Sequence, residues 1–537
     1  MTSPLRAIDN SSMFGVGNAS VIVARACDGL VFGPSGDYSA TGMARFFRDF
    51  QITGADKMNS SYRGIVIDFS AKSTHRVSAA SFENLYVANF AIGAYLRGLW
   101  FGNFVGCHFY NCYSGIYFIG ENILNCILNC AFHRGDIRGS GGAWGASFQT
   151  IDGETTQSTR IISSQFYFYD VQINVLLVFE LQIEHCELSA AQSTGVHIIG
   201  TIGGCWVRDC MIETNAASAT TGVDIANVQT SQYTMVHIVG NHITCDLPCA
   251  GSRGISVGYG NSGIVLNENA VVGFDQGIFL GGSAHVVCKF NRVHCVTSAY
   301  TRSSHAILLD SLALNCEIGP NEIIQGSPLT ARMSPGDAEI AMDDGKVFPA
   351  GTPVQFDADA NGFKPGVTYF VLESRSGSIT VGGAPGALPI TPSGDRTLNV
   401  RAAPLPLAFT SGPPHGLSFF GSGAFFTTLS GFASTVGGIV QWTSSGGLVS
   451  LSVGTEKFLS GQSNSREMSA AGIPAFLLPP SVRSCIAWVR DAGLDMLGIA
   501  HVNSRGDLTF YKSPGLEPFT SSGQKGIGNT PITYVNG

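Results

Sequence analysis

Carboxylates recur in the middle third of the chain at spacings that suit acid–base chemistry. Glu187, Asp209 and Glu213 are three of them, and His185 stands two residues before the first. Two carboxyl groups near one bond can act as general acid and as base or nucleophile, the arrangement that glycoside hydrolysis uses. We therefore treat these four residues as candidate catalytic groups.

Aromatic and basic side chains accompany these carboxylates. Aromatic rings can stack on the apolar face of a sugar while a polar end hydrogen-bonds, and arginine can bind a carboxylate through two donors. The candidate substrate-binding residues are Tyr110, His133, Trp144, Glu154, Tyr167, His197 and Arg208. His197 and Asp224 form a further pair, a histidine base with an orienting carboxylate, so Asp224 joins the candidate catalytic residues.

A repeat of 22 residues or more must position these groups. In ten successive segments a small polar residue stands two places before an apolar one. The pairs are Asn84/Tyr86, Cys107/Phe109, Cys130/Phe132, Ser164/Phe166, Cys186/Leu188, Cys210/Ile212, Asn241/Ile243, Asn269/Val271, Asn291/Val293 and Asn321/Ile323. Their spacing of 22 to 34 residues is typical of a three-sided solenoid with turn loops of variable length.

A second column of residues keeps the same phase. Its members are Gly64-Ile-Val-Ile, Gly93-Ala-Tyr-Leu, Gly115-Ile-Tyr-Phe, Gly145-Ala-Ser-Phe, Asn174-Val-Leu-Leu, Gly195-Val-His-Ile, Gly222-Val-Asp-Ile, Gly254-Ile-Ser-Val, Gly277-Ile-Phe-Leu and His305-Ala-Ile-Leu. Two columns in register over about nine turns predict an all-β fold, a right-handed parallel β-helix.

Strand geometry then assigns each side chain to a side of the solenoid. Alternate side chains point the same way, so both members of each pair face the interior, where asparagines hydrogen-bond along the stack and cysteines fill space. The residues between and beside them face outward, Glu187, Asp209 and Glu213 included. Coils about 4.8 Å apart place Glu187 roughly 8 Å, at Cβ, from both other carboxylates. This separation slightly favours inversion over retention of a glycoside.

The charge and composition of the chain argue against several other classes of protein. The 30 basic and 38 acidic residues give a net charge of −8 without a long basic run, so no nucleic-acid partner is expected. No run of 18 apolar residues occurs, so no membrane insertion is expected. The 14 cysteines include no C-x-x-C pair, and neither a metal nor a cofactor is expected. No secretion signal is apparent in the first nine residues, which favours a reducing compartment and free thiols.

The repeat stops after residue 325, where shorter alternating strands separated by turn residues begin. We predict a β-helix over 1–334, with its coils clearest over 48–325, and a small all-β module over 335–402. A β-rich connecting or trimerisation region over 403–470 and a C-terminal β-sandwich or jelly-roll-like domain over 471–537 follow.

Together these features resemble bacteriophage tailspikes that depolymerise polysaccharides. The coils are similar to the pectin-lyase-like β-helix. Val354-Gln-Phe with Ile379-Thr-Val-Gly-Gly-Ala-Pro-Gly resembles a small module of phage tail proteins, and Leu478-Pro-Pro-Ser with Gly506-Asp-Leu-Thr-Phe-Tyr resembles the ends of such spikes. The resemblance implies a homotrimer on the phage tail or baseplate. It would be made in the host cytoplasm and cleave a bacterial surface polysaccharide (capsule, exopolysaccharide or O-antigen).

One feature departs from that family, because its members usually begin with a separate domain that attaches to the virion. Here the coils begin almost at once, so either such a domain has been removed or a short segment or an adapter protein makes the attachment.

Hydrolysis is favoured, and two alternatives stay open. A polysaccharide lyase of the same fold would use His185 or Tyr167 as the base and Arg208 to neutralise a uronate. A non-catalytic receptor-binding spike or adhesin would need the same aromatic and carboxylate side chains for binding alone. A free bacterial pectinase-like enzyme is disfavoured by the missing signal peptide and by the C-terminal modules.

Overall fold

The computed structural model describes residues 1–537 except 8–10, 33–44, 56–60, 70–75, 136–141, 202, 216–217, 227–234, 247–250, 295–304, 311, 314, 325–328, 344–347, 349, 351, 360–361, 366, 376, 384–387, 394, 403–407, 410–417, 433, 435, 454–456, 471, 530 and 537. It divides into two compact units, Met1–Phe274 with Gly282–Val287 and Asp275–Gly281 with Cys288–Gly537. Among the described residues, no helix has the length and apolar character needed to cross a membrane.

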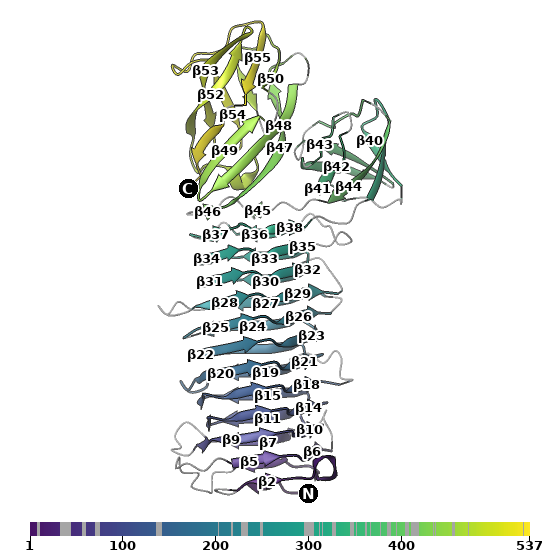
Figure 1. The fold of residues 1–537 in the computed structure, drawn as a ribbon, viewed down its shortest axis with the longest axis vertical. Coiled ribbons are helices and arrows are strands. Elements are labelled where there is room, and N and C mark those ends of the chain that lie inside the picture. The colour runs from purple at the N-terminus through teal and green to yellow at the C-terminus, as the bar shows by residue number, and fades with distance from the viewer. Residues whose placement is uncertain are drawn as a thin grey trace. The chain divides into compact units, whose positions relative to one another are not determined.

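The first unit is a solenoid of three parallel sheets, and its strands stack coil upon coil in Figure 1. Sheet A contains β1 (Leu5–Ala7), β4 (Leu30–Phe32), β7 (Arg63–Asp68), β11 (Ile92–Arg97), β15 (Ser114–Ile119), β19 (Trp144–Gln149), the first part of β22 (Val171–Glu184), β24 (Thr194–Thr201), β27 (Thr221–Ala226) and β30 (Arg253–Val257). Each of its strands is followed along the chain by strands of sheet B and then of sheet C.

Sheet B contains β2 (Met13–Phe14), β5 (Arg45–Arg48), β8 (Val77–Ser78), β9 (Ala80–Glu83), β12 (Leu99–Trp100), β13 (Asn103–Val105), β16 (Asn122–Ile123), β17 (Cys126–Leu128), β20 (Thr156–Ile162), the last part of β22, β25 (Cys205–Arg208), β28 (Val236–Val239) and β31 (Ser262–Asn267). Sheet C contains β3 (Val21–Ala24), β6 (Gln51–Gly54), β10 (Tyr86–Ala88), β14 (His108–Tyr110), β18 (Ala131–His133), β21 (Gln165–Tyr167), β23 (Glu187–Ala191), β26 (Met211–Thr214), β29 (His242–Cys245) and β32 (Ala270–Val272). A short 3-10 helix, η1 (Gly17–Ala19), precedes β3.

The predicted fold class, a parallel β-helix followed by further β-modules, is confirmed. The interior file before sheet C holds the predicted residues at 0–2 % exposure, namely Cys107, Cys130, Ser164, Cys186, Cys210, Asn241 and Asn269. Beside it the interior aromatic rings stack, with centroids 4.8 Å apart for Phe109 and Phe132 and 4.5 Å apart for Phe132 and Phe166. The twelve cysteines within the described residues are free thiols. Burial raises the pKa of Cys112 to about 12, as expected of thiols that serve packing.

The first predicted pair, Asn84/Tyr86, is out of phase by one residue. Leu85 and Val87 occupy the interior instead, at 1 % and 0 % exposure. Asn84 lies at the corner before β10 with φ +52°, and its amide donates to Asp49 Oδ1 at 3.1 Å. Asparagine suits both an interior ladder and a left-handed corner, so its residue type alone could not distinguish them.

Two members of the second column are also displaced. Ala146 pairs with Ile173 and Ser147 with Asn174, so Asn174 lies two places beyond the glycine position and faces outward. In the second unit Gln276 pairs with His305, which puts His305 one place before that position.

The second unit begins with solenoid strands, β33 (Gln276–Leu280), β35 (Arg292–His294), β36 (His305–Leu309), β37 (Glu317–Ile318) and β38 (Glu322–Ile324), while β34 (Ala284–Lys289) contributes residues to both units. A closed antiparallel barrel follows, in the order β39 (Leu329–Met333), β40 (Glu339–Met342), β43 (Ser378–Gly382), β42 (Tyr369–Arg375), β41 (Pro353–Phe356) and β44 (Arg396–Ala402). After the barrel, β45 (Ala408–Phe409) pairs with β36 and β46 (Ser418–Phe419) with β37, both in parallel. The barrel is therefore inserted before a last coil that the sequence pattern did not reveal.

The remaining residues form a ten-stranded antiparallel sheet. Its order is β50 (Phe458–Gln462), β55 (Gln524–Gly528), β52 (Arg483–Asp491), β53 (Leu494–Val502), β54 (Leu508–Tyr511), β51 (Met468–Ala470), β47 (Gly421–Ser430), β48 (Val436–Ser445), β49 (Leu448–Val453) and β56 (Ile532–Val535), with a 3-10 helix, η3 (Ala475–Leu477), between β51 and β52. The domain boundaries given above stay predictions.

The interior asparagine ladder supports a test of stability. Asn241 accepts a hydrogen bond from the Cys210 N–H at 3.0 Å, and its amide donates to Asn269 Oδ1 at 3.0 Å and to the Val207 carbonyl at 2.9 Å. Asn241→Ala leaves buried groups without partners and should lower the free energy of unfolding by about 2 kcal/mol. Urea unfolding measures this free energy. Asn103→Ala, at an exposed position, is the control, and its free energy of unfolding should lie within about 0.5 kcal/mol of wild type. Equal stabilities of the two variants would contradict the ladder's role.

Candidate functional site

The outer face of sheet C carries two files of side chains. Strand pairing places Tyr86, His108, Ala131, Gln165, Glu187, Met211 and His242 in the first file. The second file runs Ala88, Tyr110, His133, Tyr167 and Ser189. Ten of these twelve residues, all but Tyr86 and Ala88, were expected to face outward, and they lie together on one sheet.

Four rings form a continuous aromatic ladder along this face, Tyr86, Tyr110, His133 and Tyr167. The centroid separations are 6.1 Å for Tyr86 and Tyr110, 5.3 Å for Tyr110 and His133, and 5.9 Å for His133 and Tyr167. The Gly135 N–H donates to His133 Nδ1 at 3.1 Å, so this ring nitrogen acts as an acceptor. Burial, with a smaller contribution from His133, lowers the pKa of neighbouring His108. The ladder thus offers largely uncharged rings, which suit sugar faces.

Glu187 follows the ladder in the next coil and is held by neutral donors. Gln165 Nε2 donates to its Oε2 at 3.1 Å, and Ser189 Oγ donates to its Oε1 at 3.2 Å. Burial and then the Glu187 carboxylate raise the pKa of Tyr167 to about 12. Tyr167 is therefore a protonated phenol at neutral pH.

A β-bulge interrupts sheet C beside Glu187. The register between β23 and β26 shifts between Leu188 and Ala191, and Ala190 has φ +57°. A bulge places two residues opposite one and re-aims the side chains beside it. Here Ser189 lies within hydrogen-bonding reach of both Glu187 and Glu213. The bulge therefore connects two of the candidate carboxylates through one hydroxyl.

Glu213 shares its surroundings with a third carboxyl group, that of Asp246. A hydrogen bond with Asp246, followed by burial and by the charges of Asp246 and Glu187, raises the pKa of Glu213 to about 7. A second carboxyl group in contact makes the ionisation of Glu213 costly, because two negative charges would then lie side by side. We call Glu187, Glu213 and Asp246 the carboxyl cluster.

Asp246 was missed by the sequence analysis, although a signal was present. Thr244 pairs with Glu213, and the Asp246 N–H donates to the Thr214 carbonyl at 3.1 Å. Continuing the outward series from His242 and Thr244 by one more step would have reached Asp246.

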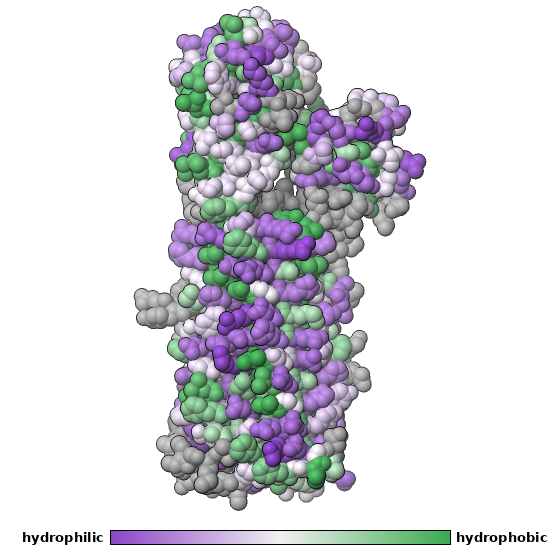
Figure 2. All heavy atoms as spheres, in the orientation of Figure 1, coloured by the Kyte–Doolittle hydropathy of each residue, from purple (hydrophilic) through white to green (hydrophobic). Residues whose placement is uncertain are grey.

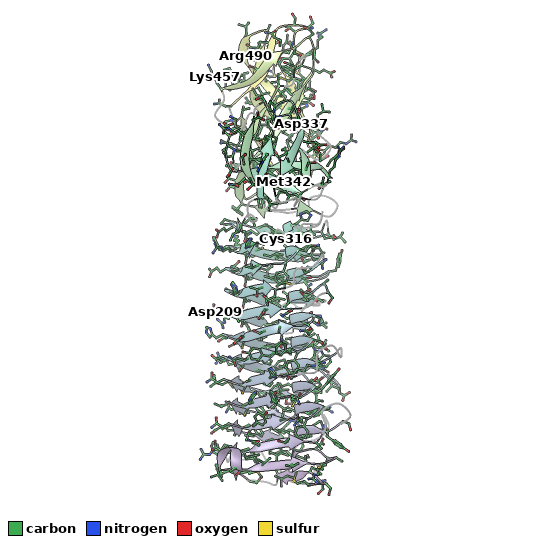
Figure 3. The ribbon with its side chains drawn as sticks, turned by 90° about the vertical axis from the view of Figure 1, so that its right-hand side faces the viewer. Asp209, Cys316, Asp337, Met342, Lys457 and Arg490 are labelled. Atoms are coloured by element: carbon green, nitrogen blue, oxygen red, sulfur yellow. The ribbon has the colours of Figure 1, made fainter. Side chains whose placement is uncertain are left out.

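Several predicted site residues do not lie on the outer face of sheet C that carries the carboxyl cluster. His185 and Asp209 occupy the corner before sheet C, both with φ +54°, and Asp209 lies at the edge of the stacked strands in Figure 3. Arg208 pairs with Glu184 at 2.6 Å and Glu154 with Arg97 at 3.2 Å.

Trp144, His197 and Asp224 belong to sheet A, so the predicted residues are distributed over more than one face. Within the described chain, no group of three or more His, Cys, Asp and Glu side chains could hold a metal ion.

Comparisons with known proteins bear on the resemblance to phage tailspikes. No family model matches the sequence. Over 295 residues, 53% of this chain, the sequence is 24% identical to the tail spike protein of Shigella phage Sf6. The predicted resemblance to phage tailspikes is confirmed. The match covers 45% of that relative, so the chain spans about half of its length.

Solved tailspikes are also among the similar structures. The Dettilon tailspike has a TM-score of 0.35 at 12% identity, covering 96% of this chain and 87% of that one. The tailspike of E. coli bacteriophage HK620, solved as a double mutant in complex with a pentasaccharide, has a TM-score of 0.37 at 10% identity, covering 75% and 86%.

The raised pKa of Glu213 can be measured without any substrate. We expect wild type to bind one proton more than Glu213→Gln as the pH falls from about 8 to about 6, because Glu213 titrates at about 7. Asp246→Asn should move this step to lower pH, since it removes a negative charge. Potentiometric difference titration measures both effects, and exposed Glu268→Gln should leave the step in place. If the step stayed near pH 7 in Asp246→Asn, Asp246 would not be the group that raises the pKa of Glu213.

Proposed function

We propose that the chain is the part of a phage tailspike that binds and depolymerises a bacterial surface polysaccharide. The observation that carries the proposal is the aromatic ladder of sheet C, which leads coil by coil into the carboxyl cluster. Rings of this kind bind sugars, and paired carboxyl groups with separated pKa values cleave glycosidic bonds. The capsule, an exopolysaccharide or O-antigen would be the substrate.

In the proposed reaction Glu213 is the general acid. A pKa of about 7 keeps much of this carboxyl group protonated near neutral pH, ready to donate a proton to the leaving oxygen. Glu187, which accepts hydrogen bonds from Gln165 and Ser189, is the base that activates water. Asp246 raises the pKa of Glu213 and so sets the pH range in which this acid works. The Ser189 hydroxyl lies within hydrogen-bonding reach of both carboxyl groups, so their nearest oxygens are at most about 7 Å apart, a separation that does not distinguish inversion from retention.

Hydrolysis is favoured over β-elimination by the state of Tyr167. A phenol whose pKa is raised to about 12 is a poor base for abstracting a proton at neutral pH. His185 and Arg208, the other members of the lyase set, lie at the corner and on sheet B rather than within the carboxyl cluster. A non-catalytic spike would use the aromatic ladder alone.

The resemblance to tailspikes extends the proposal to assembly and location. We propose a homotrimer carried on the phage tail or baseplate, which meets the polysaccharide at the bacterial surface. Size-exclusion chromatography with light scattering would give three chains per particle.

Substitutions in the carboxyl cluster test the catalytic assignment. Glu213→Gln and Glu187→Gln should each slow cleavage by about 10²-fold or more, because each removes a proton-transfer group. Binding of the same polysaccharide and the trimer should persist. Reducing-end release from purified bacterial polysaccharides measures cleavage, and ultraviolet absorbance of an unsaturated product would reveal a lyase.

Asp209, the carboxylate at the corner before sheet C, supplies a matched control for the two glutamate variants. Asp209→Asn tests the other candidate from the sequence and should retain cleavage. In wild type, activity should fall as the pH rises through about 7, and Asp246→Asn should move that limb to lower pH. Activity lost in Asp209→Asn but kept in Glu213→Gln would transfer the acid role to Asp209.

The aromatic ladder predicts a separate effect on affinity. Tyr110→Ala and His133→Ala each remove a ring and should weaken polysaccharide binding by about 5- to 10-fold, equivalent to about 1 kcal/mol. Titration calorimetry in the Glu213→Gln background measures this without cleavage. Phe101→Ala, at an aromatic ring 47 % exposed next to sheet B, is the control and should bind as wild type. If all three variants bound with the same affinity, the aromatic ladder would not be part of the binding site.

A further inference from the structure

A second group of polar and aromatic side chains lies on the outer face of sheet A and has no part in the reaction proposed above. Successive strand pairings place Tyr117, Ser147, Asn174, His197 and Asp224 in one file. Strands about 4.8 Å apart give this file a length of about 19 Å. We call these five residues, with Trp144 and Arg253 beside them, the sheet A strip. On the surface of the solenoid in Figure 2, hydrophilic and hydrophobic side chains are interspersed from coil to coil.

The middle of the strip is polar and sheltered. Ser147 and Asn174 point away from the solenoid interior, yet their exposures are 0 % and 6 %. Asn174 Nδ2 donates to Ser147 Oγ at 3.2 Å, and Gln149 Nε2 donates to the same oxygen at 3.0 Å. Sheltered polar groups on an outward face are costly unless they are paired. Pairing with one another holds these groups in place, and Ser147, at 0 % exposure, lies beneath the surface that a ligand would meet.

An aromatic platform lies at one end of the strip. The rings of Tyr117 and Trp144 are 5.4 Å apart at 42°, and the Tyr117 hydroxyl donates to Ser114 Oγ at 3.1 Å. Burial raises the pKa of Tyr117 to about 12, so this end carries no charge near neutral pH.

Charged groups lie at the other end. His197 Nε2 is 3.4 Å from Asp224 Oδ2, with side-chain exposures of 26% and 29%. Arg253 follows one coil later, because Thr221 pairs with Arg253 while Asp224 pairs with Ser256. Burial lowers the pKa of His197 against the opposing effect of Asp224. Burial likewise lowers the pKa of Arg253 against Asp224 and Tyr259. One cation, one anion and a largely neutral imidazole give this end little net charge.

We propose that the sheet A strip is a second carbohydrate-binding site, which holds a neutral or weakly acidic oligosaccharide without cleaving it. The aromatic platform would stack on a sugar ring, and the amide, imidazole, carboxylate and guanidinium groups would pair with hydroxyls along the next units. Asp224 is the one carboxylate among the strip's residues, whereas glycosidic cleavage by carboxyl chemistry uses two. A binding site beside a cleaving site keeps the protein on a polymer between cuts, since the second contact is intramolecular.

The test counts binding sites and does not depend on cleavage. An array of purified bacterial surface polysaccharides identifies one that the wild-type protein binds, and oligosaccharides prepared from it by partial acid hydrolysis serve as probes. In the Glu187→Gln, Glu213→Gln background, calorimetry should give two sites per chain. Adding Trp144→Ala and Arg253→Ala should leave one site per chain. Adding Tyr110→Ala instead should weaken the other site and leave the strip's affinity unchanged.

Two further variants separate binding from folding. Asp224→Asn keeps the shape of the strip and should weaken the second site by about 5-fold or more, since it removes a charged hydrogen-bond acceptor. Gln182→Ala, on sheet B next to Arg160, is the control and should keep both sites. With an otherwise wild-type carboxyl cluster, the strip variants should cleave short oligosaccharides at the wild-type rate.

Three outcomes would overturn the proposal. These are one site per chain in the starting background, two sites after Trp144→Ala with Arg253→Ala, or a parallel loss of cleavage that makes the strip part of the active site. Failure of the proposed depolymerase activity would appear separately, as binding at two sites without cleavage in the wild-type protein.

Discussion

The register between successive coils is the constraint on which the rest of this structure depends. In a parallel sheet a slip of one residue turns every outward side chain inward, so the surface exists as described only while each coil stays aligned with the next. Two features maintain that alignment in sheet C. Backbone N–H groups such as those of Glu187 and Met211 donate to the carbonyls of Ser164 and Cys186 in the preceding coil. In addition, the small buried side chains of the interior file contact one another along the stack. In the first unit this file ends in the hydrogen-bonded pair Asn241 and Asn269.

The proposed chemistry arises where this regularity is broken. A regular strand pair would keep Glu187 and Glu213 in fixed outward positions a coil apart. The bulge at Ala190 instead brings the hydroxyl of Ser189 between them. Asp246 adds a negative charge from the following coil, and the proton then stays on Glu213 to a higher pH. In the proposed mechanism this local irregularity separates an acid from a base, and the neighbouring regular coils supply the binding surface.

Sequence periodicity predicted most of the solenoid and erred where one residue type can serve two purposes. Asn84 matches the interior pattern by type, yet it occupies a left-handed corner that asparagine also tolerates. Asn174 was placed at the glycine position of the second column because this coil carries Gln172 there, so no glycine marked its phase. The last coil was invisible because the barrel is inserted before it, so β45 and β46 are separated in sequence from the strands they join.

The sequence by itself determined which side chains face outward in most coils, because a two-residue period assigns the side of a strand without reference to anything distant. Glu187, Glu213, Tyr110, His133 and Tyr167 follow from it. Only the tertiary structure decided which of these meet. The second column of the sequence had already assigned His197 and Asp224 to a different strand from Glu187, whereas the approach of Asp246 to Glu213 is visible only in the structure. Acid strength depends on such distances and on burial, which no periodicity contains.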